Sequence, residues 1–254
     1  WPHAYPLTGA SAILKRCNED FVVTELPLQL PCGEGEHLWL DVEKNGANTT
    51  FVAHQLAQAA GVTERDVGYA GLKDRHAVTR QWFSIYLPHG KAQARTPDLS
   101  TLAHPEFKVL SQRRHLKKLR PGDLQGNRFS IVLREVRGDR DAIEVNLKAV
   151  AAHGVPNYCG AQRFGHDGGN VAQGRAMLAR DIRVRNPKKK GIYLSAVRSF
   201  VFNEVLAWRI QQGLWGQTLP GDVLDDAGRP TGPLWGRGRV STTEQAQALE
   251  NAVA

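Results

Sequence analysis

A single carboxylate, Asp74, lies between two cations, Lys73 and Arg75, directly after a turn that contains Gly68 and Gly71. The neighbouring positive charges favour the ionised form of the Asp74 side chain. An ionised carboxylate on a loop can serve as a nucleophile. An isolated Lys-Asp-Arg tripeptide, however, is more commonly an exposed ion pair that contributes little to stability. The assignment of chemistry to Asp74 therefore depends on the longer pattern around it.

The elements that must position Asp74 are a mixture of strands and helices. Alternating or β-branched apolar runs predict strands over residues 21–24, 37–42, 81–87 and 129–133. Capping residues and apolar residues at helical spacing predict helices over residues 48–60, 141–153 and 195–211, and a further helix from residue 243 to the end. Because strands and helices do not alternate strictly, the predicted fold class is α+β with a largely antiparallel or mixed sheet. Gly154 marks the predicted domain boundary.

The positive charge of the chain is concentrated in two segments. The net charge is +8 and the pI is near 9.6. Residues 108–140 hold ten lysines and arginines against three acidic residues, and residues 163–198 hold nine against two. Such clustering predicts a phosphate-binding face and a nucleic-acid partner. The alternative is a solvated basic surface that only maintains solubility.

The remaining composition sets limits on the class of protein. A length of 254 residues allows one or two domains with a large core. No apolar run approaches the roughly 18 residues of a membrane span. Cys17, Cys32 and Cys159 form neither a disulfide framework nor a zinc-binding pattern, which is typical of a cytoplasmic protein. We therefore predict a cytoplasmic monomer with no membrane contact, no metal and no cofactor.

Five motifs resemble those of one enzyme family, the TruD family of tRNA pseudouridine synthases. They occur in the family's order between residues 18 and 203, and the clearest is Gly71-Leu72-Lys73-Asp74-Arg75 followed by Ala77, Thr79 and Gln81. The others are the Glu19-Asp20-Phe21-Val22 segment, Gly126-Asn127-Arg128-Phe129, the run from Val155 to Gly165, and the run from Tyr193 to Ser199 with Phe202-Asn203. Cys159 departs from the family pattern, in which a phenylalanine is expected.

The resemblance implies a fold, an activity and a set of site residues. It implies a catalytic pseudouridine-synthase domain over residues 1–153 and an α/β insertion domain, specific to the family, over residues 154–254. The implied reaction isomerises uridine to pseudouridine in tRNA, at position 13, with Asp74 as the nucleophile. The residues implied to bind the uridine are Phe21, Asn127, Phe129 and Lys15. The residues expected to contact RNA are Lys73, Arg75, Arg128, Arg163, Lys188, Lys189 and Lys190.

The sequence leaves two other functions open. One is a catalytically silent RNA-binding module such as an RNA chaperone, and the intact motif around Asp74 disfavours it. The other is a carboxylate-dependent hydrolase that acts on RNA or a nucleoside. No second carboxylate is evidently paired with Asp74, which disfavours a two-carboxylate glycosidase.

The last residues of the sequence also lead to a prediction about the structure. Residues 243–254 read as a helix with one polar face, where the family continues into a further catalytic segment. The chain is therefore expected to lack the C-terminal part of the catalytic domain and to have an incomplete insertion domain. An open groove or an unpaired sheet edge is expected near Asp74.

Overall fold

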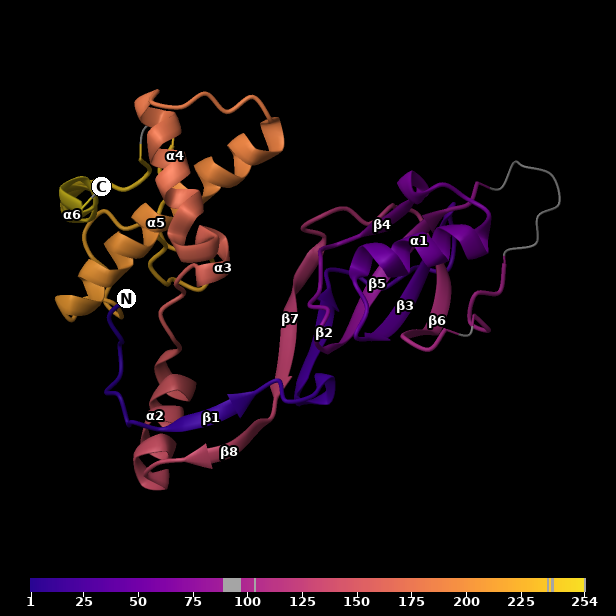
Figure 1. Ribbon diagram of the computed structural model, residues 1–254, viewed down its shortest axis with the longest axis horizontal. Coiled ribbons are helices and arrows are strands. Elements are labelled where there is room, and N and C mark those ends of the chain that lie inside the picture. The colour runs from indigo at the N-terminus through magenta and orange to yellow at the C-terminus, as the bar shows by residue number, and fades with distance from the viewer. Residues whose placement is uncertain (89–96, 103, 237, 239, 254) are drawn as a thin grey trace. The chain divides into compact units, whose positions relative to one another are not determined.

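The computed structural model describes residues 1–88, 97–102, 104–236, 238 and 240–253. The chain forms two compact units (Figure 1). One contains residues 11–137, and the other contains residues 1–10 together with residues 138–254. The α+β class predicted from the sequence is confirmed, and each unit is described separately below.

A mixed sheet forms the unit of residues 11–137. Its strands are β2 (Phe21–Pro27), β3 (His37–Asn45), β4 (Val67–Tyr69), β5 (Val78–Tyr86), β6 (Phe107–His115) and β7 (Leu124–Ile131). The order across the sheet is β6-β3-β5-β2-β7, and the short strand β4 also pairs with β5. The pair β2–β5 is parallel and every other pair in this sheet is antiparallel. The predicted mixed sheet is therefore present.

Helix α1 (Thr49–Ala60) covers one face of this sheet (Figure 1). Alternate residues of a strand point to opposite faces, so Leu38, Leu40 and Val42 of β3 all pack on the same side, in one core with Val52 and Leu56 of α1. Full burial of such a side chain contributes roughly 1.5–3 kcal/mol. The helix ends at Gly61, whose left-handed backbone (φ 66°) suits a glycine.

Two further strands pair with each other outside the main sheet. They are β1 (Ser11–Leu14) and β8 (Leu133–Arg137), and they run antiparallel. Both are exposed along their whole length. Short single-turn helices, η1 (Asn18–Asp20) and η2 (Glu64–Asp66), precede β2 and β4. Lys15 lies in the connection between β1 and η1, directly after Leu14.

The second unit is helical. It contains α2 (Arg140–His153), α3 (Ala161–Phe164), η3 (His166–Gly168), α4 (Gly169–Ala179), α5 (Pro187–Gln211) and α6 (Glu244–Val253). Helices α4 and α5 approach closely at Gly174, where a Cβ would lie 2.5 Å from Val197 Cγ2 and 2.7 Å from the Tyr193 carbonyl oxygen. Within the part of the chain that the structure describes, no helix is long and apolar enough to cross a bilayer.

The N-terminal ten residues pack with this helical unit. Trp1 stacks on Tyr158 with ring centroids 5.7 Å apart, and the Tyr5 hydroxyl donates to the Gly154 carbonyl over 2.6 Å. Asn146 of α2 also donates to the Pro6 carbonyl. Helix α2, which the sequence placed in the first domain, is therefore part of the helical unit. The boundary between compact units follows Arg137, whereas the domain boundary predicted from the family resemblance follows residue 153.

The observed start of a helix agrees with the predicted start where the sequence analysis identified the N-cap residue. Helix α1 begins one residue after Asn48, as expected. Helix α5 begins at Pro187, eight residues before the predicted start at Ser195. The side chain of Asn186 accepts hydrogen bonds from the Lys188 and Lys189 amides, and proline is well suited to the first helical position. The Asn186-Pro187 pair was the signal that the sequence reading missed.

Candidate functional site

Buried hydrogen bonds hold the loop that carries Asp74. This loop connects β4 to β5 beside the N-terminus of α1. The Lys73 amide donates to Thr49 Oγ1 over 3.0 Å, and Thr49 Oγ1 donates to Gln81 Oε1 over 3.0 Å. Gln81 Nε2 then donates to the Gly71 carbonyl over 3.2 Å. Thr49 and Gln81 are both buried, so helix α1 and strand β5 fix the loop backbone where it approaches Asp74.

Lys73 holds the same loop through an ion pair. Its Nζ lies 2.6 Å from Glu25 Oε2, and the two side chains are 5% and 1% exposed. The other carboxylate oxygen of Glu25 accepts from the Trp82 amide over 3.1 Å. The sequence suggested an RNA contact for Lys73, but its ammonium points into the protein. We therefore assign Lys73 to the support of the loop and leave it out of the proposed RNA contacts.

A second buried cation, Lys44, lies beneath Asp74. Its Nζ donates to the Asp74 carbonyl oxygen over 2.6 Å, and the residue is 1% exposed. The pKa of Lys44 is lowered to about 8, chiefly because the residue is buried; the negative charge of Asp74 opposes this shift, and the positive charge of Lys73 adds to it. The sequence reading missed Lys44. The available signal was its position in β3, where it continues the inward series of Leu38, Leu40 and Val42.

In contrast to its main chain, the side chain of Asp74 is open to solvent. It is 54% exposed, and its Oδ1 lies 3.7 Å from Lys15 Nζ. The Lys15 ammonium also lies 3.7 Å from the centroid of the Phe21 ring, which is a cation–π distance. Lys15 adopts a left-handed backbone (φ 56°), an uncommon conformation for a residue other than glycine. The structure thus brings Asp74, Lys15 and Phe21 together, as the resemblance implied.

Two aromatic rings extend this site along strands β2 and β7. Phe21 and Phe129 meet edge to face, with centroids 5.9 Å apart and an interplanar angle of 63°. Phe129 is 54% exposed, although it lies on a strand of the main sheet. Asn127 is directly opposite Glu25 in the antiparallel register and lies two residues from Phe129, so both project from the same face of β7. An exposed ring beside an exposed amide can bind a planar base by stacking and by hydrogen bonding.

The other cations near the loop are exposed. Arg75 Nε donates to the Gly46 carbonyl over 3.2 Å and the rest of its side chain is open to solvent. Arg128 is exposed on β7 and, lying between Asn127 and Phe129, points to the opposite face of the strand. Among the described strands, β7 pairs with β2 alone, and its outer edge is therefore unpaired.

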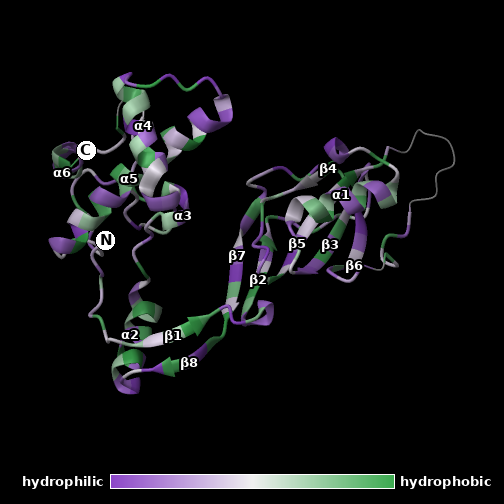
Figure 2. Ribbon diagram, viewed as in Figure 1, coloured by the Kyte–Doolittle hydropathy of each residue, from purple (hydrophilic) through white to green (hydrophobic). Residues whose placement is uncertain are grey.

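The remaining predicted RNA contacts lie in the helical unit. Arg163 of α3 is exposed, and its Nη1 donates to Ser195 Oγ over 3.2 Å. Lys188, Lys189 and Lys190 form the exposed first turn of α5, which is coloured as hydrophilic in Figure 2. Cations are unfavourable at a helix N-terminus because the helix dipole is positive there. Helix stability therefore does not account for the three lysines at this position.

The described residues provide no candidate metal centre. No group of three or more histidine, cysteine, aspartate or glutamate side chains in residues 1–88, 97–102, 104–236, 238 and 240–253 could hold a metal ion.

Comparison with known proteins gives one consistent result. The family described as tRNA pseudouridine synthase D (TruD) matches residues 3–185. The tRNA pseudouridine synthase D of Cellvibrio japonicus is 45% identical over 251 residues, which cover 98% of this chain and 74% of that protein. The enzyme of Xanthomonas axonopodis pv. citri is 42% identical over 285 residues, covering 98% and 76% respectively.

A solved structure has the same fold. The crystal structure of the putative tRNA pseudouridine synthase D from Methanosarcina mazei superposes with a TM-score of 0.67. The alignment covers 99% of this chain and 72% of that one, at 21% identity. At this identity the likeness supports the fold, while the assignment to a family rests on the sequence matches.

Proposed function

This chain belongs to the TruD family of tRNA pseudouridine synthases, which are isomerases that act on uridine in tRNA, and on that premise we propose that Asp74 is its nucleophile. The main support for the proposal is the difference between the main chain and the side chain of Asp74. The Asp74 main chain is held from below by Lys44, while its carboxylate is 54% exposed beside Lys15 and Phe21. A nucleophile requires this combination of a fixed position and an accessible reacting group.

The chemistry fits the residues present. Pseudouridine formation replaces the N1–C1′ bond of uridine with a C5–C1′ bond, and the proton lost from C5 is balanced by one gained at N1. Nothing is oxidised and no atom is added, so the reaction needs only a nucleophile that bonds transiently to the uridine and a pocket that closes around it. In this assignment the Asp74 carboxylate forms the transient bond and Lys15 balances its charge. Water must be excluded, since it would hydrolyse the intermediate.

The aromatic residues retain and orient the base. We assign Phe129 to stack on the uracil and Phe21, which meets the Phe129 ring edge to face across β2 and β7, to the adjoining wall of the site. Stacking on an aromatic side chain contributes roughly 1–3 kcal/mol per base. Asn127 offers a donor and an acceptor to the uracil edge. A detached uracil held in this way can turn and present C5 to the ribose.

The exposed cations are assigned to the RNA backbone. Arg75 and Arg128 lie in the unit that carries Asp74, whereas Arg163 and the lysines of the first turn of α5 lie in the helical unit. Phosphate neutralisation by such residues releases counterions, so tRNA affinity should fall steeply with salt. By resemblance to the family we further propose that the target is the uridine at position 13. We also propose that the enzyme acts as a monomer in the cytoplasm, where its three free cysteines would stay reduced.

The test compares Asp74→Asn with the unaltered enzyme on tRNA labelled with tritium at uridine C5. We expect the variant to bind tRNA with unchanged affinity and to release essentially no tritium. Glu43→Gln is the matched control, because it also neutralises a carboxylate in the same sheet, one that pairs with Lys108 over 2.8 Å. Comparable turnover by Asp74→Asn would remove Asp74 from the nucleophile role. Abasic ribose in place of pseudouridine would identify a hydrolase instead.

A further inference from the structure

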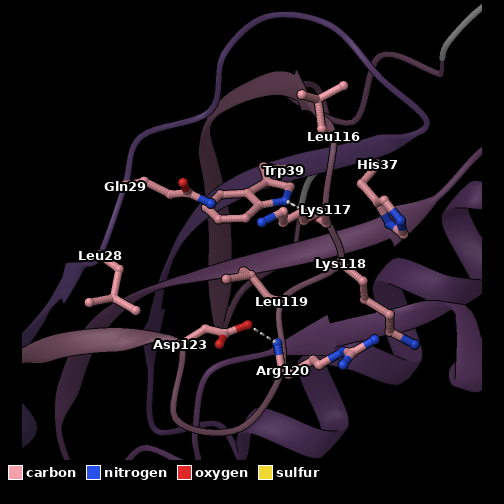
Figure 3. A pocket seen from close by; sticks show the side chains of 10 residues that line it. All are labelled: Leu28, Gln29, His37, Trp39, Leu116, Lys117, Lys118, Leu119, Arg120 and Asp123. Atoms are coloured by element: carbon pink, nitrogen blue, oxygen red, sulfur yellow. Dashed lines mark hydrogen bonds between the residues drawn. The ribbon is translucent and has the colours of Figure 1, made fainter.

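A pocket of about 690 Å³ lies in the unit of residues 11–137, apart from the residues assigned to the uridine (Figure 3). Its floor is the indole of Trp39, and His37 of the same strand lines one side. Leu28 lies at the opposite side, and the connection between β6 and β7, residues 116–123, crosses the pocket. Volumes of about 300–1,000 Å³ are typical of small-molecule and cofactor sites.

The pocket and the Asp74 site lie on opposite faces of the sheet. Trp39 alternates with Leu38 and Leu40, which pack under α1, so its side chain points away from that helix. Val23 of β2 is paired with Phe129, and the register of β2, β5 and β3 places it on the α1 side. The uridine site therefore faces the α1 side, and the pocket is a separate feature.

The wall of the pocket is strongly cationic. Lys117, Lys118 and Arg120 occur within four consecutive residues. The Lys118 ammonium donates to the Arg65 carbonyl. The ammonium of Lys117 and the guanidinium of Arg120 have no acceptor in the described part of the chain. The one acidic residue that lines the pocket, Asp123, is engaged with the Arg120 amide over 2.8 Å. Two cations are thus available for an anionic ligand.

Beside these cations the pocket offers apolar surface. Leu28 and Leu116 are 64% and 61% exposed, although both line a concave site. His37 also lines the pocket, but its Nδ1 is buried and is therefore not open to a ligand. Burial, and then the charge of Lys118, lower the pKa of His37.

The connection that crosses the pocket is attached to the segment that leads to Asp74. The Gly122 amide donates to the Ala70 carbonyl over 2.8 Å, one residue before the Gly71–Asp74 motif begins. A Cβ on Gly68 of β4 would clash with the Leu119 carbonyl, so this connection lies directly against β4. A ligand in the pocket would therefore contact a segment that packs against β4 and against the start of the Asp74 loop.

We propose that this pocket binds one nucleotide of the RNA substrate, outside the uridine that reacts. Its phosphate contacts Lys117 and Arg120, and its base lies between Leu28 and Leu116 above Trp39. The combination of nearby cations with the exposed apolar side chains of Leu28 and Leu116 matches a phosphate joined to a planar base. The proposal rests on the family's substrate being RNA, and it is independent of the role of Asp74. A free mononucleotide has the same chemistry and is the other source to be tested.

The first experiment follows the indole N–H signal of Trp39 by NMR, assigned with Trp39→Phe. This N–H donates to the Lys117 carbonyl over 2.8 Å, so it reports on the pocket wall. The probes are tRNA, uridine 5′-monophosphate, adenosine 5′-monophosphate and inorganic phosphate, each added to Asp74→Asn enzyme. A shift caused by tRNA supports the RNA source, and a shift caused by the mononucleotides alone supports the free source. No shift with any nucleotide, or an equal shift with inorganic phosphate, would overturn the proposal.

The second experiment measures tRNA affinity against salt concentration. Lys117→Ala/Arg120→Ala should weaken binding and reduce the slope of log K against log salt by about 1, because the two cations together neutralise one phosphate. Leu28→Ala/Leu116→Ala should weaken binding at an unchanged slope, because it removes apolar contacts alone. The matched control is Lys108→Ala/Arg137→Ala, which removes the same charge from exposed positions of the same unit. Equal losses in the control and the pocket variant, or none in either pocket variant, would overturn the RNA assignment.

These outcomes are separable from the function proposed for Asp74. Both experiments measure binding and not turnover, so a wrong nucleophile assignment does not change how they are interpreted. If the pocket is vacant in the complex, the tritium-release test of Asp74 is still valid. The two proposals therefore stand or fall on different readouts.

Discussion

The ammonium of Lys44 donates to the main-chain carbonyl of Asp74 over 2.6 Å from a position that is 1% exposed. The contact joins strand β3, which is interior to the sheet, to the middle of the loop between β4 and β5. It uses the carbonyl and leaves the carboxylate of Asp74 free for substrate. A buried lysine costs free energy unless its charge is compensated, so its presence under the proposed nucleophile indicates a role in holding the loop.

Lys44→Met should change how stability depends on pH. Because the pKa of Lys44 in the folded protein is about 8, below its ordinary value of 10.5, the unfolded chain retains a proton that the folded chain releases between these pH values. The unfolding free energy contributed by Lys44 therefore rises from pH 8 to 10.5, by up to about 3 kcal/mol. The rise should appear as a difference between the enzyme and Lys44→Met in urea unfolding. Parallel pH profiles for the two proteins would contradict it.

Lys15→Met should lower kcat/KM while leaving the fold intact. The substitution preserves an apolar chain over the Phe21 ring but removes the charge 3.7 Å from Asp74. We expect a loss of roughly tenfold, equivalent to about 1.4 kcal/mol in the barrier. Lys15→Arg, which retains the charge, should recover most of the activity. Equal activity in Lys15→Met and the unaltered enzyme would show that the contact is incidental.

Breaking the Glu25–Lys73 pair should be strongly destabilising. Removing one partner leaves an uncompensated buried charge, which costs about 3–5 kcal/mol. Glu25→Gln and Lys73→Met should each show this loss in urea unfolding, and the double variant should lose much less than their sum. The exposed pair Glu43–Lys108 is the control, and its removal should cost about 0–1 kcal/mol. Additive losses at Glu25 and Lys73 would contradict the pairing.

The first turn of α5 should contribute to tRNA affinity through charge alone. Replacing Lys188, Lys189 and Lys190 together with alanine should weaken binding of all tRNAs alike and reduce the salt slope by about 3. Replacing the same three with arginine should retain both, since the charges remain. An unchanged affinity and slope in the alanine variant would assign this turn to a solvated surface away from RNA.

Chelation should leave the activity unchanged. The isomerisation as proposed is carried by a carboxylate, and the described residues offer no cluster of metal ligands. The enzyme is treated with EDTA, the chelator is removed, and tritium release is measured with untreated tRNA. Activity that is lost and then restored by one specific metal ion would count against the proposed mechanism.

Local sequence patterns predicted most of the strands and helices around the Asp74 loop. The strands around residues 37–42 and 83–87 have apolar residues that alternate or run together, and the helix after Asn48 has a cap at one end and Gly61 at the other. Such signals act between residues a few positions apart. They failed at α5, where the cap at Asn186 lies nine residues before Ser195, the predicted start of the helix.

The direction of neighbouring charged side chains could not be predicted in this way. In sequence, Lys73 and Arg75 flank Asp74 symmetrically, and both were expected to contact RNA. In the structure Lys73 reaches Glu25, 48 positions earlier in the chain, while Arg75 stays exposed. The difference arises because β2 and β5 pair in parallel, which brings Glu25 beside the loop.

By itself, the sequence determined which chemical groups the protein possesses and the family to which its motifs belong, because both depend on residue types and short spacings. The tertiary structure alone decided that Lys44 lies beneath Asp74, that Lys73 is internal, and that a cationic pocket forms around Trp39. Each of these depends on strand register and on contacts between distant segments. In a strand, a shift of one residue would send every side chain to the other face. The apolar alternation of β3 indicates which side chains point inward, but only contacts between distant segments decide what they meet there.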